Sequence, residues 1–129
     1  MKAQQTDHGT LEIWSAAEVA AAFNDDSVAI IDVRTPQEYM LERIEGALLM
    51  PLAHFAPSKL PSQEGKRLVF HCGSGVRSER AARLALEAGL DNAAHLEGGL
   101  GAWKESGLAY ISVNKATGEP ERENGDAGG

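Results

Sequence analysis

The 129-residue sequence predicts a single α/β domain in which helices cover both faces of a parallel sheet. Short apolar runs rich in β-branched residues alternate along the chain with segments that carry helix-capping signals. The length suits one compact domain with its own core, and 43% hydrophobic and 24% charged residues are ordinary for a globular protein. No internal repeat or interior linker divides the chain.

The first half of the sequence predicts two capped helices on either side of a buried strand. Residues 15–18, SAAE, form a capping box that predicts a helix through about Phe23. The run 28–33 is apolar and β-branched, as in a strand buried on both faces. Residues 35–38, TPQE, form a second capping box with proline at the first helical position, so a short helix to about Glu42 follows.

The second half predicts three more strands and two more helices. Residues 47–50 form a short apolar run that ends at a proline, and 68–71 form the next strand. A helix over about 76–88 has apolar positions at helical spacing and a glycine directly after it. Residues 93–96 read as a last parallel strand, and the helix after it carries Trp103.

The cysteine lies between a predicted strand and a predicted helix start. Cys72 is the chain's one cysteine, so no disulfide can form within the chain. Unpaired amides and the positive end of the helix dipole stabilise an anion there, and Gly73 and Gly75 let the loop curl around it. Arg77 adds a cation, so the pKa of the thiol should be lowered. These features favour a reactive thiol over a buried structural cysteine, which a lone cysteine otherwise is.

The folded region resembles a single-domain rhodanese, a sulfurtransferase family. Residues 31–39, IDVRTPQEY, resemble the first signature of that family. Residues 72–78, CGSGVRS, resemble its active-site loop, and 96–99, LEGG, with Trp103 resemble its C-terminal signature. The resemblance covers about residues 11–108, and several motifs in the right order make it more specific than a cysteine loop alone.

The resemblance implies a five-stranded parallel sheet and a ping-pong reaction at Cys72. The thiolate takes a sulfane sulfur from a donor such as thiosulfate, and the persulfide then passes it to cyanide, a thiol or a protein thiol. No cofactor is implied. The active-site loop that the resemblance assigns contains Gly73, Ser74, Gly75, Val76, Arg77 and Ser78.

Asp32 ends the strand expected beside that of Cys72, so it either lines the site or serves as a cap or as an ion-pair partner of Arg34. His71 precedes the nucleophile on the opposite face of the strand, which predicts a packing or hydrogen-bonding role.

Two alternatives remain at this stage. A cysteine phosphatase uses the same thiolate cradle, but its signature has five residues between cysteine and arginine, and this loop has four. A non-enzymatic sulfur carrier or partner-binding module is the other, although such modules often lack the cysteine. Family members active on thiosulfate often carry Arg or Lys directly after the cysteine, so Gly73 predicts weak use of that dianion.

Charge and composition narrow the partners. Twelve basic and 19 acidic residues give a formal net charge of −7, which argues against nucleic acid and anionic membranes. A small anionic sulfur donor and a thiol acceptor remain, and the histidines lack metal-ligand spacing.

The start of the sequence has no signal-peptide pattern, so the expected compartment is the cytoplasm. We expect a flexible arm over 1–10, a rhodanese-like domain over 11–113 and a flexible acidic tail over 114–129.

Overall fold

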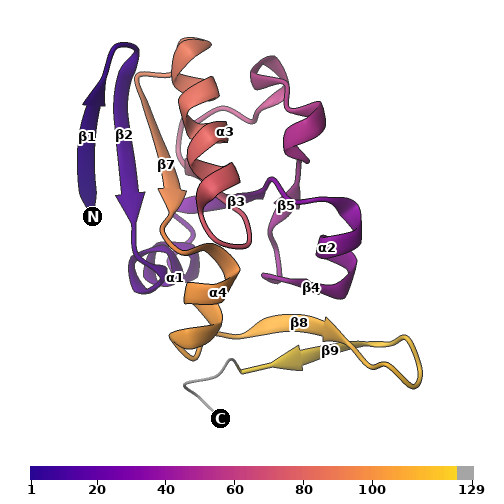
Figure 1. Cartoon of the computed structure of the whole chain (residues 1–129). Helices are drawn as coiled ribbons and strands as arrows, with labels where there is room; N and C mark the ends of the chain where they lie inside the picture. Colours follow the sequence, from indigo (N-terminus) through magenta and orange to yellow (C-terminus); the bar gives the residue numbers. More distant parts are fainter. Residues whose placement is uncertain (125–129) are drawn as a thin grey trace.

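The computed structural model describes residues 1–124, and its centre is a six-stranded sheet (Figure 1). Its strands, from edge to edge, are β1 (Lys2–Thr6), β2 (Gly9–Trp14), β7 (Asn92–Leu96), β6 (Arg67–His71), β3 (Val28–Asp32) and β5 (Leu48–Leu49). The pairings from β2 to β5 are parallel, and β1 alone runs antiparallel to its neighbour. The expected five parallel strands are therefore confirmed, with one antiparallel edge strand added.

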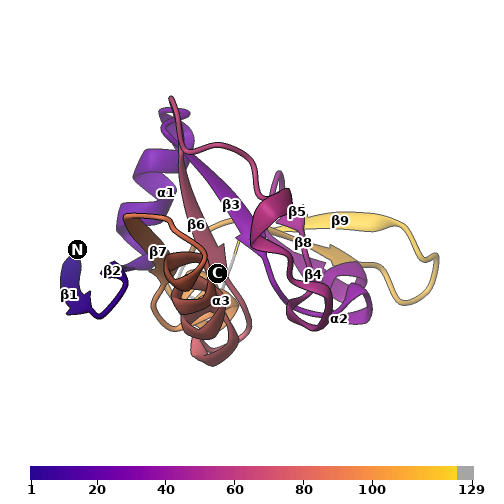
Figure 2. The ribbon, with the colours of Figure 1, turned by 90° about the horizontal axis from the view of Figure 1, so that it is seen from above.

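Helices cover both faces of this sheet, as the sequence predicts. Figure 2 shows α1 (Ala16–Asn24) and α3 (Val76–Glu87) on opposite sides of β6 and β7. One buried cluster joins α1 and α4 (Gly99–Glu105) to one face of the sheet, and a second cluster joins α3 to the other face. The short helices η1 (Leu52–His54) and η2 (Pro57–Lys59) follow β5, and apolar residues beside them pack on the α3 side.

Both predicted capping boxes are present. The Ser15 hydroxyl accepts from the Glu18 amide at the start of α1, and the Glu18 carboxylate accepts from the Ser15 amide. Thr35 and Glu38 make the same reciprocal pair at the start of α2 (Pro36–Leu41). These local signals set where each helix begins, and the helix starts in turn fix the ends of the loops beside them.

The N-terminal segment, for which the polar sequence predicts a flexible arm, contains two strands in the structure. Residues 2–14 form the β1–β2 hairpin, and β2 then pairs in parallel with β7 through residues 10–14. The side chains of β1 are mostly exposed, so the strand has no apolar alternation. Backbone pairing with β2, whose Leu11 is fully buried, holds it in place.

The expected acidic tail also contains structure. Strands β8 (Tyr110–Val113) and β9 (Pro120–Glu123) pair antiparallel, and β4 (Glu42–Arg43) completes a second, three-stranded sheet. The Asn114 side chain accepts hydrogen bonds from the amides of Ala116 and Thr117 and so holds the turn. Residues 114–124 thus contain part of a β-hairpin where the sequence predicts a tail without secondary structure, and the rest of that prediction, 125–129, lies outside the described residues.

Across residues 1–124, none of the helices is long and apolar enough to cross a membrane.

Candidate active site

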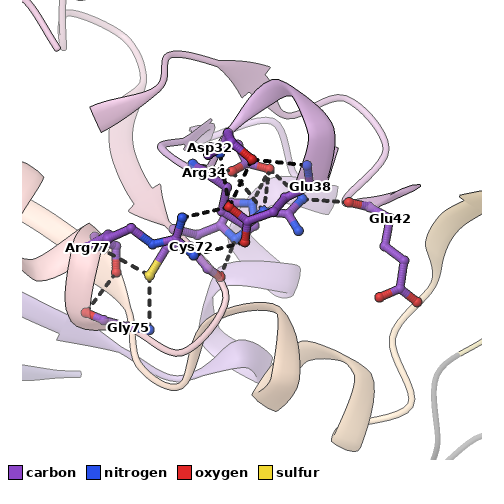
Figure 3. Close-up of polar contacts among 10 residues, drawn as sticks. Asp32, Arg34, Glu38, Glu42, Cys72, Gly75 and Arg77 are labelled. Carbon is purple, nitrogen blue, oxygen red and sulfur yellow. Dashed lines mark hydrogen bonds and ion pairs between the residues drawn. The ribbon is translucent and has the colours of Figure 1, made fainter. Parts of the chain in front are cut away.

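Cys72 follows β6 at the carboxyl end of the sheet and precedes the first turn of α3 (Figure 3). Its side chain is fully buried, and its Sγ accepts hydrogen bonds from the amides of Gly75, at 3.0 Å, and Ser78, at 3.4 Å. Burial is the largest influence and raises the pKa of the thiol. Hydrogen bonds from Ser78, Gly75 and Ser74 outweigh it and hold the pKa below its ordinary value. The arrangement can therefore present a thiolate.

The start of α4 holds the same loop from behind. The Leu100 amide donates to the Cys72 carbonyl oxygen at 2.8 Å, and the Gly101 amide donates to that of Gly73 at 3.2 Å. Gly99 has a φ of +58°, and a side chain there would collide with the Cys72 carbonyl oxygen. The glycine is therefore required by this close approach of two backbones.

Arg77 pairs with a residue from a different element. Its Nη1 and Nη2 donate to Glu38 Oε1 at 2.7 Å and Oε2 at 3.0 Å, so the contact between α3 and α2 is bidentate (Figure 3). The hydrogen bonds from Arg77 lower the pKa of Glu38 to about 2, and Glu38 in turn raises the pKa of Arg77. Both groups are thus charged throughout the neutral range.

Asp32 forms the ion pair that the sequence left open, in a buried network beneath the loop. Its Oδ1 accepts from the Arg34 amide at 3.0 Å, and its Oδ2 accepts from Arg34 Nη2 at 2.8 Å. His71 Nε2 lies 3.1 Å from Asp32 Oδ2, and its Nδ1 lies 3.1 Å from the Cys72 carbonyl oxygen. Burial raises the pKa of Asp32, but the contacts with His71 and Arg34 outweigh it and lower that pKa well below its usual range. His71 therefore lies between Asp32 and the backbone of Cys72.

Ser78 has a second partner in His95 on β7. The Ser78 hydroxyl donates to the Gly75 carbonyl oxygen at 3.1 Å, and His95 Nδ1 lies 3.0 Å from the same hydroxyl oxygen. His95 is buried, and this burial lowers its pKa, so it is neutral at neutral pH. The imidazole and the hydroxyl form a neutral hydrogen-bonded pair behind the loop.

The remaining loop side chains point elsewhere. Ser74 is exposed, and Val76 is 76% exposed. Gly73 has no side chain, and a Cβ built there would meet only the Arg77 guanidinium, at 3.6 Å. Within residues 1–124, no group of three or more His, Cys, Asp or Glu side chains is arranged to hold a metal ion. The structure thus brings Cys72, Gly75, Arg77 and Ser78 together.

A known family has the same architecture. The family model described as Rhodanese-like domain matches residues 15–106, which is more than half of the chain. The chain belongs to the rhodanese-like family. This rhodanese-like domain is 43% identical over 91 residues to the uncharacterized protein slr1261 of Synechocystis sp., a match that covers 70% of the chain and 51% of that protein.

Two further comparisons bear on the domain's chemistry. It is 39% identical over 80 residues to a probable adenylyltransferase/sulfurtransferase, MoeZ, of Mycobacterium tuberculosis, covering 59% of the chain and 20% of that protein. A solved structure from Rhodopseudomonas palustris, described as a protein of unknown function and possible tyrosine phosphatase, superposes with a TM-score of 0.64. It is 31% identical, and the match covers 75% of this chain and 82% of that one. The domain spans about half of the Synechocystis protein and a fifth of the mycobacterial one.

Two residues of the rhodanese-like site were not predicted as such from the sequence. Glu38 is recognisable as a capping residue, and that role hides its pairing with Arg77, 39 positions away. His95 lacks metal-ligand spacing with the other histidines, and nothing local indicates its contact with Ser78, 17 positions away. A sheet order with β7 beside β6 was the available signal, because it brings His95 opposite Phe70, near the end of the strand that leads to Cys72.

Proposed function

We propose that this rhodanese-like domain is a sulfurtransferase that carries a sulfane sulfur as a persulfide on Cys72. The observation that carries the proposal is the pair of amides, from Gly75 and Ser78, that donate to a fully buried Sγ. Such a cradle stabilises negative charge on sulfur, whether the sulfur belongs to a thiolate or to the persulfide formed from it.

The proposed reaction has two displacement steps. The Cys72 thiolate attacks the sulfane sulfur of a donor such as thiosulfate, a sulfur–sulfur bond forms, and sulfite leaves with the electron pair of the broken bond. A thiolate or cyanide then attacks the outer sulfur of the persulfide and restores the Cys72 thiolate. The chain has one cysteine, so the acceptor must come from another molecule, and a reducing cytoplasm would keep the thiol available.

The geometry favours sulfur transfer over phosphate ester hydrolysis. Four residues separate Cys72 from Arg77, and a phosphoryl group with three non-bridging oxygens needs a wider cradle than one sulfur atom. Arg77 is also engaged on both terminal nitrogens by Glu38. Similarity to part of a protein of Mycobacterium tuberculosis described as a probable adenylyltransferase/sulfurtransferase supports the same choice. A purely partner-binding module would not need a Cys72 whose pKa is lowered.

The test is to weigh the protein after incubation with thiosulfate. We expect a gain of about 32 Da, one sulfur atom, that disappears on treatment with dithiothreitol and does not form in Cys72→Ser. Absence of the adduct with thiosulfate, polysulfide and 3-mercaptopyruvate alike would contradict the proposal. Hydrolysis of p-nitrophenyl phosphate by wild type that is lost in Cys72→Ser would instead support the alternative function, a cysteine phosphatase.

A further inference from the structure

The cation of the Cys72 loop is already neutralised. Both terminal nitrogens of Arg77 donate to the Glu38 carboxylate, at 2.7 and 3.0 Å. The Glu38 carboxylate is itself held by the amide and the hydroxyl of Thr35, each 3.1 Å from Oε1. The Arg77 guanidinium and the amide and hydroxyl of Thr35 thus fix the Glu38 carboxylate at the first turn of α2. A donor that approaches the loop therefore meets Arg77 already paired with this carboxylate.

The other charges beneath the loop also cancel. Asp32 and Arg34 form a buried pair, with Nη2 and Oδ2 2.8 Å apart. Position 73, next to the nucleophile, is glycine and carries no charge. A thiolate at Cys72 adds a negative charge to these two neutral pairs. Backbone amides can therefore donate hydrogen bonds to a doubly charged donor. Neither Arg77 nor Arg34 provides an uncompensated positive charge for it.

We propose that Glu38 is a specificity-determining residue: by neutralising Arg77, it makes the Cys72 loop select sulfur donors with at most one negative charge over dianions such as thiosulfate. This inference rests on the proposed sulfurtransferase function and adds the charge class of the donor. The backbone amides can stabilise one negative charge on the donor. The second charge of a dianion would need a cation, and the nearby cation, Arg77, is already paired with Glu38.

Thiosulfate and methanethiosulfonate form a matched pair of donors for this question. A methyl group in the second replaces one oxygen of the first, so their charges are −2 and −1 while the sulfane sulfur is the same. Thiolate attack on either forms one sulfur–sulfur bond and breaks another. The bonding electrons leave with sulfite in the first case and with methanesulfinate in the second, so charge and atoms balance.

The experiment measures the second-order rate of the 32 Da gain with each donor in wild type, Glu38→Gln and Glu79→Gln. Glutamine at position 38 keeps the capping oxygen of α2 and removes the charge. Glu79 pairs with Arg83 on the same helix as Arg77, at 3.0 Å, so its replacement is the control for a lost negative charge near the loop. We expect methanethiosulfonate to load wild type faster than thiosulfate. We expect Glu38→Gln to reduce that rate ratio roughly tenfold, and Glu79→Gln to change it less than about twofold.

Several outcomes would overturn the inference and leave the proposed function standing. These are the absence of a preference for the singly charged donor in wild type, an unchanged rate ratio in Glu38→Gln, and an equal shift of that ratio in Glu79→Gln. If Glu38→Gln does not fold, Gly73→Lys is the second variant, because lysine adds a cation that Glu38 does not neutralise. A Cβ at position 73 meets only the Arg77 guanidinium, so the side chain has room. This variant must also lower the ratio of the methanethiosulfonate rate to the thiosulfate rate. If wild type gains no sulfur from either donor, the proposed function itself is wrong, and the inference falls with it.

Discussion

Ser78 contacts Cys72 through two of its groups. Its amide donates to Sγ at 3.4 Å, and its hydroxyl also contributes to the lowered pKa of the thiol. The hydroxyl is kept in place by the Gly75 carbonyl oxygen at 3.1 Å and by His95 Nδ1 at 3.0 Å. The hydroxyl has one proton to donate, so it stabilises a negative sulfur by turning that proton from the Gly75 carbonyl oxygen toward Sγ, while His95 keeps the oxygen in place.

Replacing Ser78 should therefore raise the pKa of Cys72. In Ser78→Ala the thiolate loses a hydroxyl donor, so the charged form is less stable and sulfur loading moves to higher pH. Ser74→Ala is the control, because Ser74 acts on the thiol through its backbone, which alanine keeps. The ultraviolet absorbance of the thiolate, titrated below the range, about pH 10, in which the two tyrosines ionise, reports Cys72, since the chain has one cysteine. Equal thiol pKa values in Ser78→Ala and wild type would contradict the assignment.

At this scale the sequence indicated Cys72 and its loop as the candidate site, but not the residues that hold them. Cys72, the glycines and Arg77 are readable because strand, loop and helix start are contiguous in the sequence. Glu38 and His95 come from other elements, 39 and 17 positions from their partners, and reach the loop only once the chain is folded. Local patterns carry no information about such contacts, whereas the order of strands in the sheet does.

At the scale of elements, the Asp32 network joins neighbouring strands at the end where the site lies. Asp32 ends β3, and His71 ends β6 directly opposite it in the sheet. Arg34, just after β3, also donates from Nη2 to the Glu42 carbonyl oxygen at 2.6 Å and so ties β4 to the same point. The network fixes where β6 ends and therefore where Cys72 lies.

Removing the charge of Asp32 should unfold the domain more easily. In Asp32→Asn the buried Arg34 loses its counter-ion, and we expect the free energy of unfolding at neutral pH to fall by about 3–5 kcal/mol. Asp26→Asn, which breaks an exposed pair with Lys66, should cost less than about 1 kcal/mol. Urea unfolding of both variants measures the difference, and similar costs would show that the Asp32 network does not stabilise the fold.

The Asp32–Arg34 ion pair also makes the stability of the folded domain depend on pH. The pKa of Asp32 is lowered in the folded state, so its stabilising contribution is complete above the unfolded value, about 3.9, and is lost as the pH falls below that. The difference in unfolding free energy between wild type and Asp32→Asn should therefore narrow in acid.

The elements themselves were predictable where their signals are local. The capping boxes at Ser15 and Thr35 and the apolar run of β3 each lie within a few residues, and each marks an element of the structure. The outer hairpins carry no such signal. Most side chains of β1 and β9 are exposed, and both strands exist because a neighbouring strand supplies backbone partners. Pairing of that kind is a property of the fold rather than of a segment.

At the scale of the whole molecule, the net charge of −7 governs the approach of any anionic donor. The domain repels thiosulfate at long range, and dissolved salt screens that repulsion. Raising sodium chloride from about 0.01 M to about 0.15 M shortens the Debye length from about 30 Å to about 8 Å and should speed sulfur loading from thiosulfate roughly two- to fivefold. The rise should be smaller for methanethiosulfonate, which carries one charge. A rate that falls with salt would mean that a local cation, and not the overall charge, controls capture.

The hydrogen bonds that main-chain amides donate to the Cys72 sulfur also bear on how this domain could be redesigned. Amides of Gly75 and Ser78 donate to Cys72, and a backbone amide survives almost any change of side chain. Ser74 and Val76, in the same loop, are exposed and take no part through their side chains. The exposed side chains of this loop can therefore change without removing the amide donors to the sulfur. A combinatorial library at those two positions would therefore change the exposed surface beside Cys72 while every member kept the same two amide donors to the sulfur.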